Sequence, residues 1–263
     1  MSKDAVFERL LQEYPWPEQC PSESPVDWSM DAGGRDTLVR LIRERRMTTV
    51  LEIGVFLGGS LRQWLAASPA VRVVAVDPWP CFPEMPEVVR RHGKPAAVAT
   101  QLTAYPDALY HTFLGNFWDE RHRVVPVRST GVEVLERLAA IGLEPDLIYL
   151  DADKSGEELQ LCERLFPRAL LAGDDWFWTD AGEAYRGRDE EHPIRGPVRA
   201  SADRRKGHLL VDQSTWVVLD SSPSLSSRLW YSTRYFAKSS CRRMKREIHA
   251  LRHAYRGATV GSP

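Results

Sequence analysis

The sequence predicts an α/β fold, a doubly wound and mainly parallel sheet covered by helices. Three apolar runs, Thr48–Ile53, Val71–Asp77 and Asp146–Asp151, have the composition and length of buried strands. Helical patterns follow them, and strands that alternate with helices are typical of a parallel sheet. The chain has 263 residues, 43% of them hydrophobic, which is enough for the core of one domain with appended segments.

Helices are also expected ahead of the first strand. Ala5–Tyr14 has the pattern of a short helix, and a proline-rich stretch follows it through Pro25. The segment Arg35–Arg45 predicts a second helix, with Leu38, Leu41 and Ile42 on its buried face. We therefore assign residues 1–46 to an N-terminal helical cap.

The segment Leu51–Ser60 predicts a tight turn between the first strand and a helix. Gly54, Gly58 and Gly59 allow positive φ angles and would let a ligand lie against the backbone. Ser60 stands at the helix entrance, where a hydroxyl and an amide can bind an anionic group. The spacing differs from the G-x-G-x-x-G of dinucleotide-binding loops, which weakens the case for NAD. A plain structural turn remains an alternative.

Asp77 ends the second strand about two dozen residues after the first, at the position that suits the hydroxyls of a ribose. A helix cap or a turn is the alternative role for this residue. Pro78 and Pro80 argue against a helix that starts at once, and Trp79 between them offers a flat face for an adenine.

Two strand ends later in the chain are acidic. Asp146–Asp151 and Arg168–Asp174 read as buried strands, and Ser155–Phe166 between them reads as a helix with a capping box at Ser155 and Glu158. Such a unit is a right-handed parallel crossover, so both carboxyl ends lie at one edge of the sheet. Carboxylate oxygens there suit Mg²⁺, Mn²⁺ or Ca²⁺, and the predicted metal ligands are Asp151, Asp174 and Asp175. Acids that cap helices or face water are the alternative.

One family has these motifs in this order. The chain shows ExGxxxGxS at Glu52, Gly54, Gly58 and Ser60, then Asp77, LIYLDADK and LLAGDDW. It resembles the class I S-adenosylmethionine-dependent methyltransferases, and within them the metal-dependent small-molecule O-methyltransferases, similar to catechol and macrocin O-methyltransferases. The resemblance covers Val50 to Leu219. It implies a Rossmann-like, seven-stranded sheet with an antiparallel last strand, in a core of residues 47–220.

The resemblance also implies an activity and roles for single residues. The activity is methyl transfer from S-adenosylmethionine to a hydroxyl of a small molecule such as a sugar, a phenol or another natural-product intermediate, assisted by Mg²⁺, Mn²⁺ or Ca²⁺. Lys154, which matches the family's lysine three residues after Asp151, is the leading general base. His192 is an alternative base that the residues alone suggest, although a lone histidine in a loop is more often only a surface residue. The cofactor-binding residues are expected to be Glu52, Gly54, Phe56, Gly58, Ser60, Asp77, Trp79, Ser129 and Asp151.

Other segments are expected to shape the substrate site and to close the fold. Trp176–Trp178 can stack on a substrate, although at least one of the three can simply be core. Asp180–Gly196 reads as a lid or long loop, and His208–Leu219 as a hairpin around Asp212–Ser214. Pro126 lies inside the predicted strand Val124–Arg128, which is tolerable only at a sheet edge or a bulge.

Residues 221–263 are expected to form a basic helical C-terminal extension. Arg228–Arg256 holds nine Lys or Arg against one acid, Glu247, with apolar residues at helical spacing. Docking on the acidic body or on a partner subunit is favoured, and contact with nucleic acid or an anionic membrane is the alternative. An RNA-binding methyltransferase, a non-catalytic S-adenosylmethionine-binding protein and a protein with non-methyl chemistry therefore remain rival functions, although AGDDW differs from the NPPY type of base methylation.

Composition adds the last expectations. No run of about 18 apolar residues and no signal-peptide pattern is found, and four scattered cysteines fit a reducing compartment, so a cytoplasmic location is expected. The partner is expected to be a hydroxylated small molecule rather than nucleic acid, and homo-oligomer formation stays open.

Overall fold

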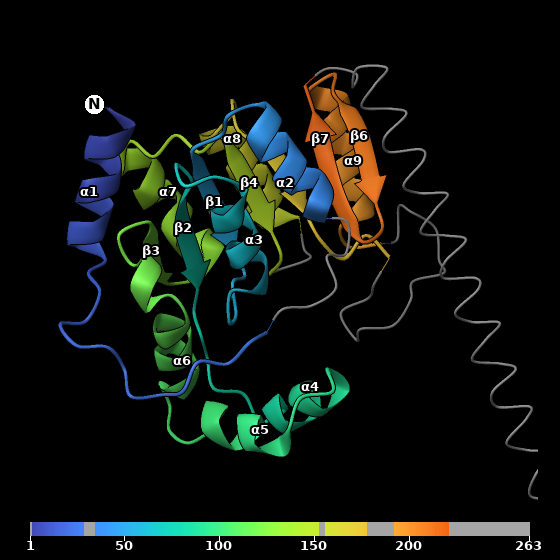
Figure 1. Cartoon of the computed structure of the whole chain (residues 1–263). Coiled ribbons are helices and arrows are strands. Elements are labelled where there is room, and N and C mark those ends of the chain that lie inside the picture. Colours follow the sequence, from blue (N-terminus) through green and yellow to red (C-terminus); the bar gives the residue numbers. More distant parts are fainter. Residues whose placement is uncertain (1, 29–34, 153–155, 178–191, 221–263) are drawn as a thin grey trace, which may run out of the picture. The chain divides into compact units, whose positions relative to one another are not determined.

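The computed structural model describes residues 2–28, 35–152, 156–177 and 192–220. In this part of the chain seven strands form one sheet in the order β3-β2-β1-β4-β5-β7-β6 (Figure 1). Neighbouring strands from β3 to β5 run parallel, and β7 runs antiparallel to both β5 and β6. This confirms the predicted mainly parallel sheet with an antiparallel last strand. The strands are β1 Thr49–Ile53, β2 Arg72–Asp77, β3 Val124–Arg128, β4 Leu147–Leu150, β5 Leu170–Gly173, β6 His208–Asp212 and β7 Thr215–Leu219.

Helices cover both faces of the sheet, as the doubly wound prediction requires. One buried cluster includes Leu38, Trp64 and Phe113, and the cluster on the other face includes Leu138 and Val198. Strand β1 is buried along its whole length because its alternate residues enter the two clusters. The described helices are α1 Lys3–Glu13, α2 Arg35–Glu44, α3 Gly59–Ala67, α4 Met85–Arg91, α5 Ala96–Leu102, α6 Ala108–Asn116, α7 Gly131–Ile141, α8 Glu157–Leu165 and α9 Arg195–Arg204, with a 3₁₀ turn at Trp118–Glu120.

Strand β3 contains the proline that the sequence analysis singled out. Pro126 lies opposite Ala75 of β2, and β3 is the edge strand of the sheet. An edge strand tolerates the missing amide because no further strand has to pair with it. The prediction that Pro126 requires an edge or a bulge is confirmed.

The two helices assigned to an N-terminal cap lie at different places. Helix α1 packs beside α7 and β3, and its Lys3 and Asp4 form ion pairs with Asp146 and Arg72, which stand where strands β4 and β2 begin (Figure 1). Helix α2 packs on α3 and brings Arg35 to the opposite, carboxyl ends of the strands. Only the second helix is therefore placed to take part in a site at those ends.

Some local predictions need correction. Helix α8 begins at Glu157, and its N-cap is Gly156, which has a φ of 77° and offers no side chain, so the predicted capping box does not start this helix. Ser155 itself lies outside the described residues. Of the predicted loop at 180–196, residues 180–191 also lie outside them, and helix α9 begins at Arg195. The hairpin of β6 and β7 is confirmed, with the turn where it was expected. The predicted extension at 221–263 lies outside the described residues.

One further property of the described helices concerns membranes. Among the residues that the structure describes, no helix combines the length and the apolar content needed to cross a bilayer.

Candidate functional site

A cavity of about 300 Å³ opens at the carboxyl ends of β1, β4 and β5. It lies where the strand order reverses between β1 and β4, which is the place where open α/β sheets bind ligands. Its volume is at the lower end of the range for small-molecule sites. The residues that line it are Trp28, Arg35, Gly54, Val55, Phe56, Gly59, Ser60, His92, Asp151, Asp174 and Asp175.

The loop after β1 forms one wall of this cavity and is held by Asp77. One carboxylate oxygen of Asp77 accepts hydrogen bonds from the amides of Val55 and Phe56 at 3.0 and 2.8 Å, and the other accepts the amide of Trp79 at 2.6 Å. Burial raises the pKa of Asp77 above its ordinary value, while these three amides lower it in part. The turn role that the sequence analysis left as an alternative is therefore present, and a role toward a ribose stays a prediction.

The glycines of this loop are needed by the protein itself. Gly54 and Gly58 have φ angles of 86° and 78°, as predicted. A side chain on Gly54 would lie 2.4 Å from the carbonyl oxygen of Asp151, and one on Gly58 would lie 2.1 Å from the ring of Phe117. Close packing against Asp151 and Phe117 therefore requires both glycines, which agrees with the plain structural turn left open above; the approach of a ligand to this backbone stays a prediction.

Glu52 stands behind the cavity wall. It is fully buried; one of its oxygens accepts a short hydrogen bond from the Ser60 hydroxyl, and the other accepts the indole N–H of Trp64 at 2.9 Å. Burial raises the pKa of Glu52 to about 7, against the opposing effects of Ser60, Arg35 and Trp64. Its visible role is to fasten α3 to β1, and direct contact with a cofactor stays a prediction.

Helix α3 points its amino end at the cavity. The helix begins after Gly58 with no side-chain cap, and Gly59 and Ser60 line the cavity. Backbone amides at such an end, together with the helix dipole, attract a carboxylate or another anionic group. The amides lie as the sequence predicted, but the Ser60 hydroxyl donates to Glu52, so only the backbone at this helix end is placed for an anion; its binding stays a prediction.

Two further predicted cofactor residues lie beside Asp77. Ser129 follows β3, and its amide donates to the carbonyl oxygen of Asp77 at 3.2 Å. Trp79 has no exposed surface, packs on Phe113 and Tyr110, and donates its indole N–H to the carbonyl oxygen of Phe56. The expected open face for an adenine is therefore not present, because side chains of α6 cover this ring.

The acidic strand ends come together as predicted. Strands β4 and β5 are parallel neighbours, so Asp151 and Asp174 follow them at the same edge. Asp175 comes next, with a φ of 61°, and lines the same cavity. Burial and the neighbouring Asp174 raise the pKa of Asp151 well above its ordinary value, and Arg35 opposes this.

A residue that the sequence analysis did not select, Arg35, lies between these acids. One terminal nitrogen of its guanidinium is 2.5 Å from Asp174 and 3.4 Å from Asp151. Its Nε donates to the hydroxyl of Tyr149 at 2.9 Å, and that hydroxyl donates to Asp174 at 3.1 Å. Burial would lower the pKa of Arg35, but Tyr149, Asp151 and Asp174 raise it above its ordinary value. One feature of the sequence could have indicated Arg35. A cation in the first turn of a helix is electrostatically unfavourable, so its presence there predicts an acidic partner.

The predicted metal does not fit the acids as they are arranged. A divalent ion needs several oxygen atoms that converge on one open point. The facing oxygens of Asp174 and Asp151 converge on the guanidinium of Arg35 instead. Among the described residues no group of three His, Cys, Asp or Glu side chains is placed to hold a metal. The predicted ligands therefore meet, but around an arginine.

The two predicted bases have different outcomes. Lys154 lies outside the described residues. His192 is buried, and its Nδ1 accepts the amides of Ile194 and Arg195 at 3.2 and 3.3 Å at the start of α9. This geometry gives His192 a structural role in starting that helix.

The aromatic segment after β5 is divided between core and surface. Trp176 is buried, whereas Phe177 is 46% exposed, and the guanidinium of Arg195 lies over both rings. The expectation that at least one of the three aromatics belongs to the core is confirmed by Trp176. Trp178 lies outside the described residues.

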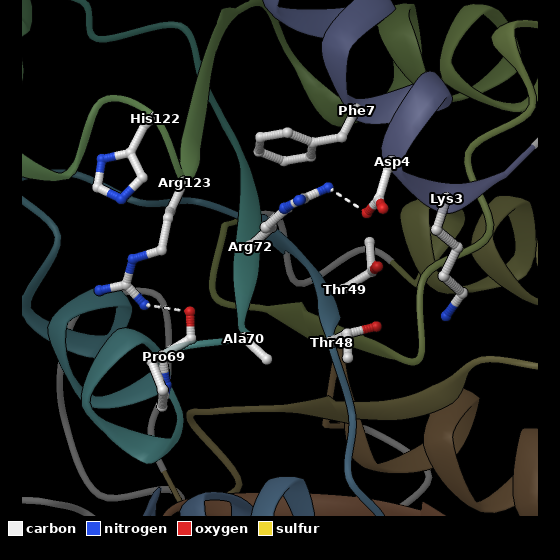
Figure 2. A pocket seen from close by; sticks show the side chains of 10 residues that line it. All are labelled: Lys3, Asp4, Phe7, Thr48, Thr49, Pro69, Ala70, Arg72, His122 and Arg123. Atoms are coloured by element: carbon white, nitrogen blue, oxygen red, sulfur yellow. Dashed lines mark hydrogen bonds and ion pairs between the residues drawn. The ribbon is translucent and has the colours of Figure 1, made fainter.

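A second cavity of about 360 Å³ lies at the amino ends of the strands, among Lys3, Thr49, Arg72 and Arg123 (Figure 2). Figure 2 shows Arg72 joined to Asp4, and this ion pair measures 2.7 Å. The basic side chains have partners here, since Lys3 and Arg123 pair with Asp146 and Glu120. This cavity lies at the opposite end of the strands from the loop after β1, and the ion pairs Lys3–Asp146 and Arg72–Asp4 join α1 to the sheet here.

Comparisons with known proteins add the following. No protein-family model matches the chain, and no curated protein matches it. Among solved structures, the O-methyltransferase TomG from Streptomyces achromogenes, in complex with S-adenosylmethionine, is 17% identical with a TM-score of 0.49, over 83% of this chain and 90% of that chain.

Two other solved structures have lower TM-scores over a similar share of the chain. An O-methyltransferase from Bacillus cereus in complex with S-adenosylhomocysteine is 18% identical with a TM-score of 0.42, over 83% of this chain and 92% of its own. An S-adenosylhomocysteine-bound methyltransferase of Podospora anserina is 17% identical with a TM-score of 0.42, over 83% and 88%. These TM-scores are below 0.5, so the fold assignment rests on the strand order and strand directions of this chain.

Proposed function

We propose that this chain is an S-adenosylmethionine-dependent methyltransferase that methylates a hydroxyl group of a small molecule. The observation that carries the proposal is the cavity at the β1–β4 switch point, with an uncapped helix end on one side and acids on the other. S-adenosylmethionine has a carboxylate, an amino group and a sulfonium cation. A ligand with both charge types is complementary to a cavity with both kinds of wall.

Different walls of the cavity are suited to different groups of the cofactor. Gly59 and Ser60 at the start of α3 are suited to the carboxylate of the cofactor, and the acids at the ends of β4 and β5 favour its positive groups. Asp77 fixes the loop between these two places through the amides of Val55 and Phe56. Preorganised walls of this kind align a methyl group with an attacking oxygen.

The reaction requires a proton acceptor near the substrate hydroxyl. When bound, the cofactor supplies an electrophilic methyl carbon, which leaves the sulfur as it bonds to the substrate oxygen. The hydroxyl proton has to pass to a base, and Lys154 is our candidate by its position three residues after Asp151. A sugar or a phenol is the substrate class that we propose from the resemblance in sequence, and a divalent metal is not part of this proposal.

Calorimetric titration of the full chain with S-adenosylmethionine and S-adenosylhomocysteine tests cofactor binding. Ser60→Ala should weaken binding roughly tenfold, because Glu52 then loses the hydrogen bond that fastens the start of α3, whose backbone amides are the proposed donors to the carboxylate. Ser68→Ala, at the far end of the same helix, is the matched control and should bind as the wild type does. Absence of binding by the wild-type chain would refute the proposal.

Turnover tests the second half of the proposal. The chain should convert S-adenosylmethionine to S-adenosylhomocysteine in step with methylation of a hydroxylated compound from a panel of sugars and phenols. Binding of the cofactor without S-adenosylhomocysteine formation across a panel that includes RNA would favour a non-catalytic binding protein. Methylation of RNA alone would replace the small-molecule substrate.

A further inference from the structure

We propose that Arg35 is the built-in cation of the acidic strand ends, and that its guanidinium takes the place of a divalent metal beside the cofactor cavity. Arg35 is then a positioning residue: it holds Asp174 and Asp151 in place and compensates their charge. The consequence that methyl transfer by this chain needs no divalent metal rests on the proposed function. The cation site itself can be tested without it.

The geometry around Arg35 is that of a closed network. The guanidinium donates through Nε to the Tyr149 hydroxyl, which in turn donates to Asp174, and a terminal nitrogen of Arg35 reaches the same Asp174 oxygen. Tyr149 is fully buried in β4 and packs on Trp64, so its hydroxyl is fixed. Three groups from α2, β4 and the end of β5 are thereby held in one arrangement.

Burial makes this arrangement hard to exchange for a metal. The side chains of Arg35 and Asp174 are only 10% and 8% exposed. A guanidinium moved out of such a place leaves carboxylates without their cation, and an incoming Mg²⁺ has to give up part of its tightly held water. The arginine is attached to α2 and needs no encounter from solution, which favours it over a free ion.

The position of Arg35 in its helix is an independent observation. Arg35 is the first residue of α2, where the helix dipole disfavours a positive charge. It is also among the few buried charged residues of the described chain. Burial and the helix dipole are offset by the Tyr149 hydroxyl and the acids at the strand ends, so the side chain is kept there by its partners and not by the helix.

Manganese binding to the full-length chain, freed of metal with EDTA and measured by the electron paramagnetic resonance of free Mn²⁺, tests this inference. The wild type should bind Mn²⁺ no tighter than about 1 mM, because Arg35 fills the site. Arg35→Gln should bind at least about tenfold tighter, since the acids then lack their cation. The double variant with Asp174→Asn should lose this gain. Arg40→Gln, which removes an arginine of the same helix whose side chain is 27% exposed and pairs with Glu44, should behave as the wild type does.

Two outcomes overturn the inference. One is a wild-type chain that binds one Mn²⁺ below about 0.1 mM and loses it on Asp174→Asn, since the acids then prefer the metal. The other is a folded Arg35→Gln variant that gains no affinity for Mn²⁺.

A second measurement decides the matter if Arg35→Gln does not fold. At 1 mM Mn²⁺, about the lower limit expected for the dissociation constant, at most half of the wild-type sites hold the ion. The melting temperature of the wild type should therefore rise only slightly. A larger rise that Asp174→Asn removes would overturn the inference. Neither readout uses S-adenosylmethionine, so failure of cofactor binding would count against the proposed function alone.

Discussion

Replacement of Glu52 by glutamine should make the stability of this protein less dependent on pH. Glu52 is fully buried and accepts hydrogen bonds from Ser60 and Trp64. Glutamine has the same shape as glutamate. Its side-chain carbonyl can accept the hydrogen bond from the indole N–H of Trp64, and its NH₂ group can donate to the Ser60 oxygen once the Ser60 hydroxyl hydrogen has rotated away. The variant therefore keeps the contacts between α3 and β1 and removes only the titration.

The magnitude follows from the pKa of Glu52. Burial raises this pKa from 4.5 to about 7 in the folded chain. Because the folded-state pKa is the higher one, the unfolded chain releases the proton first as the pH rises. The contribution of Glu52 to stability is fully present below pH 4.5 and is lost as the pH rises through about 7. The displacement of the pKa corresponds to roughly 3 kcal/mol.

Urea unfolding of the full chain at several pH values between about 5 and 8 measures this effect. The difference in unfolding free energy between Glu52→Gln and the wild type should change in favour of the variant by roughly 2 to 3 kcal/mol over this range. Glu44→Gln, which removes an exposed carboxylate of α2, controls for the loss of one charge. Parallel curves for the wild type and Glu52→Gln would refute the reasoning, because Glu52 would then titrate alike in the folded and unfolded chains.

The remaining predictions concern the groups around Glu52. Arg35→Met should lower the unfolding free energy by about 3 kcal/mol, since it leaves the buried Asp174 without its cation, whereas Arg40→Met should change it by less than about 0.5 kcal/mol in the same urea assay. Gly54→Ala should destabilise the chain by roughly 3 kcal/mol or more, because the new carbon meets the Asp151 carbonyl. Gly93 also has a positive φ, 65°, but no atom lies near the position of the new carbon, so Gly93→Ala should lower the unfolding free energy by only about 1 kcal/mol. Equal losses in the two variants would contradict the packing argument. Asp77→Asn should speed hydrogen exchange of the Val55 and Phe56 amides at least about tenfold, because both amides donate to the charged carboxylate that the variant removes. NMR measures this exchange, and an unchanged rate would show that other contacts hold the loop.

The sheet and the meeting of the acids could be predicted because short-range patterns determine them. Apolar runs of strand length and the crossover rule were enough to place Asp151 and Asp174 at one edge, and Pro126 limited its strand to a sheet edge or a bulge, of which the structure has the edge. The antiparallel hairpin of β6 and β7 also followed from its turn residues. These features depend on neighbours in the sequence or on rules that hold for any parallel sheet.

The partners of the polar side chains could not be predicted in the same way. Arg35 precedes Asp174 by 139 residues, and no local pattern joins them. Trp79 was expected to present an open face, yet helix α6, about 30 residues further along the chain, covers it. The choice among several acceptors for one donor depends on the three-dimensional packing of helices α2 and α6, which periodicity does not specify.

The contacts of Glu52 and Asp77 change what a mutation at these positions can show. Both carboxylates face the protein in this structure, since one fastens helix α3 and the other holds the loop after β1. Loss of cofactor affinity in a variant at either position is therefore not by itself evidence of contact with the cofactor, because removal of the carboxylate also frees the wall of the cavity to shift. Affinity therefore has to be read together with unfolding free energy and with exchange of the loop amides. A loss of affinity with both of these unchanged would indicate a direct contact, whereas a loss that scales with loop opening would indicate that these acids bind the cofactor only through the shape they impose.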